Sequence, residues 1–184
     1  MGREFNYEIL TEIKERWSPR AFSKETITDE DIEALIEAAR YAPSCFNEQP
    51  WRFLVAKDID SLEKMREGLA PTNQEWANKS PVLIMIASKK HFSGNEKNNS
   101  WHMFDAGTAW GYLSLEGQRR GLITHAMGGF SQEKIRSSFQ ISDELDIITI
   151  VAVGKYGDIN QLNSELRDRE KPGIRKPIQD IMIK

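Results

Sequence analysis

The chain has 184 residues, about the length of one domain, and its formal net charge at pH 7 is -3. A hydrophobic share of 39% and a charged share of 29% are ordinary for globular proteins. The slight acidic excess disfavours a general binder of nucleic acid or anionic membranes, so any bound phosphate must meet a local group of basic residues. We expect residues 1–184 to form a single domain.

Cysteine content and hydropathy limit the kinds of site and the cellular locations to be expected. Cys45 is the one cysteine, which excludes an internal disulfide and any multi-cysteine metal site. The N-terminal residues lack the apolar core of a signal peptide, and no stretch approaches the ~20 apolar residues of a membrane span. We therefore expect a cytoplasmic protein without a membrane or nucleic-acid partner.

The first half of the chain alternates helix and strand patterns. Residues 6–16 have an apolar side and predict a short amphipathic helix. Thr28 is a good N-cap followed by acidic residues, and the apolar repeat after it predicts a helix that Pro43 stops. The other elements predicted here are strands at 51–56 and 82–87 and a helix at 59–69.

The second half begins with the longest predicted helix, residues 100–120, which Gly121 ends. Five residues step around one face of this helix: Trp101, Phe104, Thr108, Tyr112 and Leu115. Residues 147–153 are almost all apolar and β-branched, which predicts a central strand covered on both faces. Between them the pattern predicts a short strand at 122–127 and a helix from Ser131 to about residue 139.

Interleaved helices and strands indicate an α/β or α+β protein in which helices cover a mixed sheet. The residues after Gly154 form a long polar tail with two prolines and little core of its own. A tail of this kind is typically stabilised by docking on something else, and a partner subunit is the obvious candidate.

Familiar catalytic motifs are missing from the sequence. It contains neither a G-x-x-x-x-G-K-[ST] phosphate loop nor a G-x-S-x-G nucleophile elbow. His91, His102 and His125 form no metal-binding pair, so each is expected on the surface or as a satisfied core residue. The pattern points away from side-chain chemistry and toward a bound cofactor.

The first of three polar segments is RWSPRAFS, residues 16–23. Arg16 and Arg20 flank a Ser-Pro turn, so both guanidinium groups can lie close together with the Ser18 hydroxyl on the same side. Guanidinium groups offer paired donors to a phosphate, which suits a phosphate or ribityl chain. On spacing alone, a solvated basic turn between two helices is an equally open reading.

Two further segments carry polar groups or glycines. Ser44, Asn47 and Gln49 lie in the loop of residues 41–53, where amides suit the polar edge of an isoalloxazine ring, although an ordinary polar loop has the same composition. Residues 124–130 contain paired glycines that allow a flat ligand to approach the backbone closely; a tight turn is the alternative.

Together these segments resemble the nitroreductase family, and they occur in the family's order. The family's Arg-x-Ser-x-Arg-x-Phe motif is met by Arg16 to Phe22, and its Ala-Pro-Ser-x-x-Asn-x-Gln-Pro-Trp motif by Ala42 to Trp51. The remaining matches, which extend the resemblance over nearly the whole chain, are Asp105 and Gly107 in the long helix, Gly121-Leu122 at its end, Gly-Gly-Phe at 128–130, Val153-Gly154, and Arg175-Lys176-Pro177.

The resemblance implies an α+β fold, a three-layer α/β/α sandwich with a mixed, mainly antiparallel central sheet and a C-terminal tail that wraps the partner subunit. It also implies a homodimer with FMN at the subunit interface. Arginines and Ser18 would hold the phosphate and ribityl end, the loop after residue 42 would reach in from the other subunit, and Gly128 would lie near the N5 edge. The residues implied to bind FMN are Arg16, Trp17, Ser18, Arg20, Pro43, Ser44, Asn47, Gln49, Asn73, Met127, Gly128, Gly129, Arg175 and Lys176.

The activity implied by the resemblance is that of an FMN-dependent oxidoreductase. Electrons would pass from NADH or NADPH through FMN to nitroaromatic, quinone or similar flat acceptors in a ping-pong mechanism. FMN carries the chemistry, so no catalytic side chain and no metal are expected. Reductive dehalogenation or flavin cleavage on the same fold, and non-enzymatic flavin binding, remain as alternatives.

Overall fold

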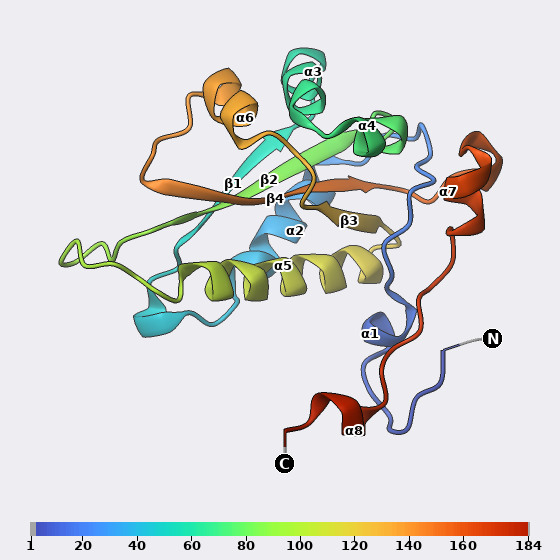
Figure 1. The fold of residues 1–184 in the computed structure, drawn as a ribbon, viewed down its shortest axis with the longest axis horizontal. Helices are drawn as coiled ribbons and strands as arrows, with labels where there is room; N and C mark the ends of the chain where they lie inside the picture. Colours follow the sequence, from blue (N-terminus) through green and yellow to red (C-terminus); the bar gives the residue numbers. More distant parts are fainter. Residues whose placement is uncertain (1–2, 184) are drawn as a thin grey trace.

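The computed structural model describes residues 3–183 and contains a four-stranded sheet with helices on both faces (Figure 1). The strand order is β1 (Trp51–Ala56), β2 (Val82–Lys89), β4 (Leu145–Gly154) and β3 (Ile123–Met127). Every pairing among these strands is antiparallel. The two central strands carry the apolar runs, as expected for strands covered on both faces. The α+β sandwich is therefore confirmed.

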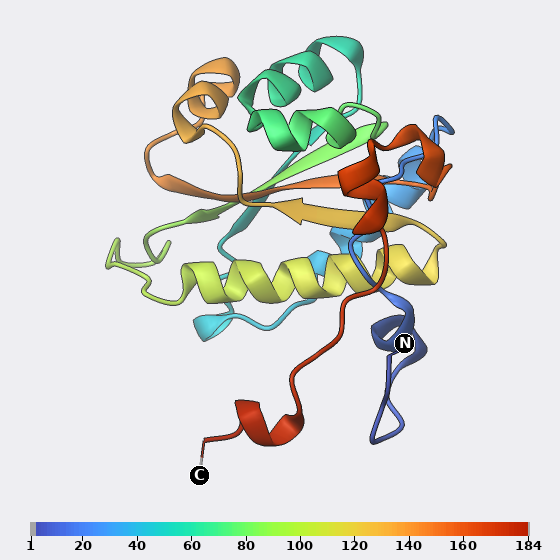
Figure 2. The ribbon, with the colours of Figure 1, turned by 45° about the vertical axis from the view of Figure 1, so that its right-hand side comes forward.

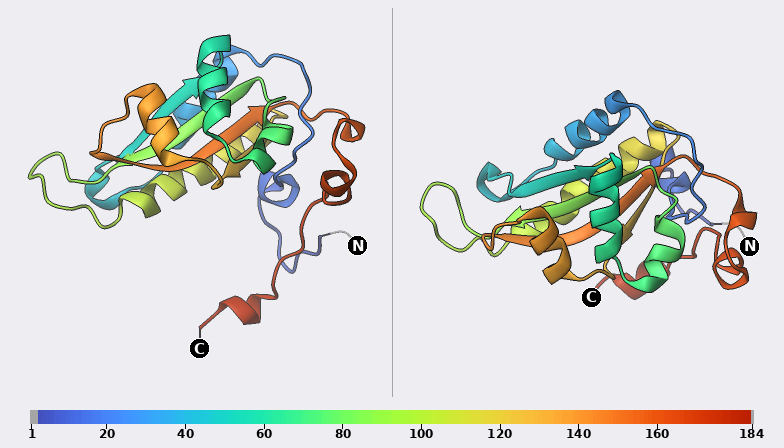
Figure 3. Two further views of the ribbon diagram at one scale, coloured as in Figure 1. Left: turned by 45° about the horizontal axis from the view of Figure 1, so that its top comes forward. Right: turned by 90° about the horizontal axis from the view of Figure 1, so that it is seen from above.

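Alternating side chains of β2 divide the core into two layers, because successive residues of a strand point to opposite faces. Ile84 and Ile86 pack with the helices α2 (Asp29–Arg40) and α5 (His102–Arg119). Leu83 and Met85 face the opposite layer. That layer contains α3 (Ile59–Gly68), α4 (Pro71–Ala77) and α6 (Gln132–Phe139) (Figure 3).

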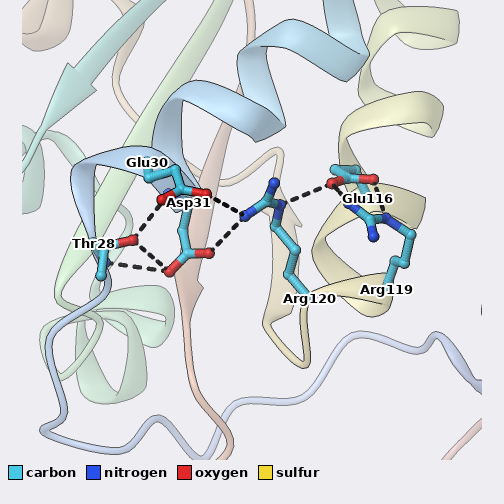
Figure 4. Close-up of polar contacts among 6 residues, drawn as sticks. All are labelled: Thr28, Glu30, Asp31, Glu116, Arg119 and Arg120. Atoms are coloured by element: carbon cyan, nitrogen blue, oxygen red, sulfur yellow. Dashed lines mark hydrogen bonds and ion pairs between the residues drawn. The ribbon is translucent and has the colours of Figure 1, made fainter.

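Helix α2 begins where its capping residue was predicted. The Thr28 hydroxyl accepts a hydrogen bond from the backbone of Asp31, whose carboxylate in turn accepts one from the Thr28 backbone, which forms a capping box. Arg120 then joins α2 to the end of α5: its guanidinium contacts Asp31 at 3.1 Å and Glu116 at 2.8 Å (Figure 4). These contacts hold α2 and α5 together at one end of the helical layer that the two helices form.

Helix α5 buries a different face from the one marked by its aromatic residues. Its buried side contains the apolar residues Ala106, Ala109 and Leu113 together with polar residues such as His102 and Asp105. Phe104 is 70% exposed and Tyr112 is 42% exposed, so the predicted apolar stripe faces outward in the single chain. The expected helix is confirmed, whereas the face that it presents to the core is not the aromatic one.

The two ends of the chain extend away from the sheet (Figure 2). The helix expected over residues 6–16 is only one short turn, α1 (Thr11–Glu15). After β4 the tail contains a 3-10 turn, η2 (Ile159–Gln161), and the short helices α7 (Ser164–Asp168) and α8 (Ile178–Ile181). Residues 171–183 are all exposed. No helix within residues 3–183 is long and apolar enough to cross a membrane.

Candidate functional site

The Arg16–Arg20 loop runs from the end of α1 to a short bridge with the segment after β4. Phe22 pairs with Tyr156, and the amide of Gly157 donates to the Ala21 carbonyl at 2.8 Å. The carboxylate of Glu170 accepts hydrogen bonds from the backbone of Arg20 at 2.7 Å and of Ala21 at 2.9 Å. Two distant parts of the chain thus hold the backbone of this loop.

Three arginines from three segments surround one end of this loop. Arg3 from the N-terminal segment, Arg16 and Arg175 from the tail line a cavity of about 790 Å³ between the chain ends and α5. Arg3 donates hydrogen bonds to the carbonyls of Lys14 and Arg16 at 3.0 and 2.7 Å, and its Nε is buried without a partner. Lys176 also lines the cavity.

Arg3, Arg16 and Arg175 form no ion pair within residues 3–183, so their charges are not neutralised there. Burial lowers the pKa of the Arg16 guanidinium, and the positive charges of Arg3 and Arg175 lower it further. A lowered arginine pKa means that the charged form is disfavoured where it stands. An anion placed among these groups would remove that penalty.

A second part of the site lies at the end of β3. Met127 is buried, whereas Gly128 and Gly129 are exposed, and a Cβ built on Gly128 would meet no atom within 4 Å. The Gly129 carbonyl accepts hydrogen bonds from the Ala70 amide and from the side chain of Asn73, both at 2.9 Å. The structure therefore brings Asn73 together with the glycine pair and leaves open space beside the backbone.

His125 and Trp76 connect these two parts. Nδ1 of His125 is 2.9 Å from the carbonyl oxygen of Pro19, within the Arg16–Arg20 loop. The His125 ring packs against Trp76 of α4, and the Arg20 guanidinium lies 5.9 Å from the centre of the Trp76 ring. Trp17 lies at the outer side of the loop, edge-on to Tyr156. Arginine loop and glycine pair therefore belong to one continuous region.

The loop after α2 is strained in the way that functional loops often are. Phe46, Asn47 and Gln49 all adopt positive φ angles between 51° and 57°, a conformation costly for residues other than glycine. The Ser44 hydroxyl accepts a hydrogen bond from the Gln49 amide at 3.0 Å. The side chains of Asn47 and Gln49 are exposed, as is Pro43. The turn η1 (Cys45–Asn47) thus presents polar groups to its surroundings.

This loop lies at the far end of α5 from the arginine loop (Figure 1). The Cys45 amide donates to Asp105 in the first turn of α5, whereas Glu15 of α1 contacts Gln118 in its last turn. Positions 105 and 118 are about 20 Å apart along a helix axis. Within one chain, the loop of residues 43–49 and the loop of residues 16–20 therefore do not meet.

Sequence reasoning missed two residues of this region and the hydrogen-bond partner of a third. Arg3 had no motif around it, and Glu170 lies in the polar tail, where one more carboxylate carries no signal. His125 lies inside one of the segments singled out, and its expected role as a satisfied core residue agrees with its hydrogen bond. What the sequence did not show is that its partner is the arginine loop.

The groups gathered in this region are suited to binding a ligand. Residues 3–183 contain no group of three or more His, Cys, Asp or Glu side chains that could hold a metal ion. The described region offers the arginines of the cavity, the side-chain amide of Asn73 and the exposed backbone of Gly128 and Gly129. An α+β sandwich with an unneutralised arginine cluster beside open backbone defines a protein suited to a flat ligand with an anionic end.

Comparison with known proteins agrees with this class. The model of the nitroreductase family matches residues 13–75 and 68–155. A protein of Archaeoglobus fulgidus with the provisional name NADH dehydrogenase/NAD(P)H nitroreductase is 30% identical over 151 residues, covering 80% of this chain and 84% of its own. The chain belongs to the nitroreductase family.

Solved structures show the same fold. A crystal structure described as an oxidoreductase containing FMN superposes with a TM-score of 0.94 at 34% identity, covering 98% of this chain and 93% of that one. A nitroreductase-family protein from Exiguobacterium sibiricum, in complex with FMN, has a TM-score of 0.79 at 21% identity. Among curated relatives, mouse iodotyrosine deiodinase 1 is 30% identical over 150 residues, 67% of this chain and 51% of that protein.

Proposed function

We propose that this protein is an FMN-dependent oxidoreductase that takes electrons from NADH or NADPH and reduces nitroaromatic, quinone or similar flat acceptors. The observation that carries the proposal is the cluster of Arg3, Arg16 and Arg175, which share one cavity and have no carboxylate partner within residues 3–183. The phosphate of FMN is an anion of the kind that such a cluster binds.

The residues present fit FMN in three respects. The arginine cluster suits the phosphate, and Ser18, which lies between Arg16 and Arg20 in the chain, supplies a hydroxyl that suits the ribityl chain. The open backbone at Gly128 suits the edge of a flat ring system. Asn73 already donates to the Gly129 carbonyl and would stand next to that ring. FMN-containing relatives with the same fold support this assignment.

Bound FMN would supply the redox chemistry, accepting two electrons as a hydride from the nicotinamide and passing two electrons on to the acceptor in a second half-reaction. The chain's own residues bind and orient. Arg16, Arg20 and Arg175 anchor the anionic end, and the exposed glycine backbone leaves room for nicotinamide and acceptor to use one face in turn.

We propose that the working form is a homodimer in which each flavin site takes the loop of residues 43–49 from the second subunit. Support comes from the separation of that loop from the arginine loop within one chain. Exposed apolar side chains on α5 and on the tail, such as Phe104 at 70% and Ile174 at 81%, supply surface for such an interface.

The activity is tested by anaerobic titration of the purified protein. We expect a yellow protein whose flavin absorbance is bleached by NADH or NADPH and restored by a nitroaromatic compound or a quinone. A colourless protein that takes up no added FMN would contradict the proposal. Flavin binding without bleaching by either nicotinamide would instead indicate a non-enzymatic flavin-binding protein.

Reductive dehalogenation is a second candidate, supported by the identity with iodotyrosine deiodinase 1 over 67% of this chain. The same reduced protein should then release halide from a halogenated phenol. Measuring free iodide alongside loss of a nitro compound separates the two activities in one experiment. Iodide release without nitro reduction would favour the dehalogenase.

The shared site has its own test. Arg16→Ala and Asn47→Ala chains carrying different affinity tags are combined, and heterodimers are isolated through both tags. If each site uses Arg16 of one chain and Asn47 of the other, one of the two sites in a heterodimer is free of both substitutions and regains FMN. No recovery in verified heterodimers would contradict a shared site.

A further inference from the structure

His125 occupies the middle of β3, where it pairs with Ala152 of β4. Its Nδ1 is 2.9 Å from the carbonyl oxygen of Pro19. A carbonyl oxygen only accepts hydrogen bonds, so Nδ1 carries the proton and donates it. The side chain therefore links the sheet to the turn between Arg16 and Arg20.

The imidazole ring is held in place by a stack of aromatic residues. The centres of the His125 and Trp76 rings are 4.4 Å apart, and Trp76 in turn stacks on Phe22 with an angle of 10° between the ring planes. Trp76 and Phe22 are both fully or almost fully buried. Arg20 lies over the same Trp76 ring at 5.9 Å. The orientation of the imidazole is thus fixed by packing on a ring that also supports Arg20.

The electrostatic setting favours a neutral donor at this position. Arg16 and Arg20 face His125 from the loop, and their positive charges, after burial, contribute to lowering the pKa of His125 to about 4. On the other side of the loop, Glu170 of the tail accepts from the Arg20 and Ala21 amides. A lysine or arginine in place of His125 could donate the same hydrogen bond only by adding another positive charge to this cluster.

We propose that His125 is a positioning residue, whose neutral Nδ1–H holds the Pro19 carbonyl and thereby sets the Arg16–Arg20 loop for the phosphate end of its ligand. This inference rests on the proposed function, because that ligand is FMN. His125 also lies two residues before Met127, the last residue of β3, which Gly128 follows. His125 therefore connects the loop that would bind the phosphate to the backbone that would lie beside the flavin ring.

Matched substitutions separate the hydrogen bond from the packing. In His125→Asn the amide nitrogen occupies the same position along the side chain as Nδ1 and retains a neutral donor. His125→Leu keeps an apolar body of similar width and removes the donor. His125→Gln keeps polarity but places the amide one bond farther out, which provides a second disrupting variant if the leucine variant folds poorly.

The readout is the ratio of the dissociation constants of riboflavin and FMN, measured with flavin-free full-length protein, because only FMN carries the phosphate. We expect His125→Leu and His125→Gln to weaken FMN binding about tenfold, the size of one lost hydrogen bond at its upper range, with riboflavin binding unchanged. His125→Asn should keep the wild-type ratio. Equal losses for both ligands, or no change in the ratio, would overturn the positioning role.

Amide hydrogen exchange of residues 16–22 in the flavin-free protein gives a ligand-independent readout, and exchange there should accelerate in His125→Leu. Arg136→Met is the control for general destabilisation, since Arg136 binds the carbonyls of Ile141 and Leu145 at the start of β4, whereas the arginine loop bridges the segment after the end of β4. It should lower the melting temperature and keep the ratio. If wild-type protein bound neither flavin, the proposed function would fail, and the assigned role of His125 with it. If the wild-type protein binds FMN and His125→Leu binds it with the same dissociation constant, only the positioning role is wrong.

Discussion

Replacing Gly157 by alanine should destabilise the fold through the backbone of the arginine loop. A Cβ at this position would lie 2.6 Å from the Ser23 nitrogen and 2.7 Å from the carbonyl carbon and oxygen of Phe22. All three neighbours are backbone atoms, so no side-chain rotation relieves the contact. Restoring an ordinary 3.4 Å contact requires the segment 21–23 to retreat by about 0.8 Å.

That retreat stretches two hydrogen bonds, from the Gly157 amide to Ala21 at 2.8 Å and from the Ser23 amide to Lys155 at 2.9 Å. Overpacking costs about 1–3 kcal/mol and each weakened hydrogen bond up to about 1 kcal/mol, which together give a loss of roughly 2–4 kcal/mol. In a chain of this length the melting temperature should fall by about 5–15 °C.

Urea unfolding followed by circular dichroism measures this loss, and Gly94→Ala is the matched control, because a Cβ there meets nothing within 4 Å. The control should remain within about 0.5 kcal/mol of wild type. If the two variants unfold at the same urea concentration, the close approach at Gly157 does not constrain the loop and the reasoning fails.

Three further outcomes follow from the same contacts. Glu170→Gln removes the charge from one buried and one partly buried backbone hydrogen bond and should lower the unfolding free energy by about 1–3 kcal/mol in urea; an unchanged midpoint would count against this anchor. Because burial lowers the pKa of His125 from 6.5 to about 4 in the folded chain, the unfolding free energy should fall by about 3 kcal/mol as the pH falls from 6.5 to 4, and this loss should be absent in His125→Asn. Gly107→Leu, on the exposed face of α5, should leave unfolding of the single chain nearly unchanged but shift sedimentation toward monomer; an unaltered dimer would remove α5 from the interface.

The sheet was predictable because its strands carry their own signal. Residues 51–56 form β1 with the expected bounds, and the β-branched run 147–153 lies within the central strand β4. Helix α2 was predictable from its cap, since Thr28 and Asp31 lie three residues apart and need no distant partner. Local patterns succeeded where the stabilising contacts are themselves local.

The predictions that failed concern elements whose structure depends on contacts between residues far apart in the sequence. The amphipathic pattern of residues 6–16 produced only α1, because Tyr7 and Leu10, at 73% and 64% exposure, find nothing in the chain to pack against. The α4 helix was not anticipated, and its Trp76 became core only through contact with Phe22 and His125. Such contacts join residues tens of positions apart and leave no mark in a short window of sequence.

The candidate site shows the same division. The three polar segments were found from their composition and order, and Asn73 does contact the glycine segment. Arg3 and Glu170, in contrast, act on the backbone of residues 16–21 from the two ends of the chain. No spacing rule connects positions separated by 150 residues, so only the folded chain shows that both ends converge on one loop.

Convergence of like charges from separate segments has a thermodynamic consequence. Arg3, Arg16 and Arg175 come from the N-terminal segment, the loop and the tail, and their mutual repulsion opposes the docking of these segments. An anion that binds only the docked arrangement stabilises it, by about 2.7 kcal/mol at a concentration one hundred times its dissociation constant. The tail of residues 171–183 should therefore be ordered in part by its ligand.

Limited digestion with trypsin tests this coupling at the Arg175–Lys176 bond, which is exposed in the tail. Lys171 and Lys176 are each followed by proline, so trypsin does not cut after them. FMN should slow cleavage there by at least tenfold at saturation, whereas riboflavin, which lacks the phosphate, should protect far less. Inorganic phosphate at high concentration should give intermediate protection, since it neutralises the arginines without engaging the glycine backbone. Equal cleavage rates with and without FMN would show that the arginine cluster does not couple the tail to the ligand.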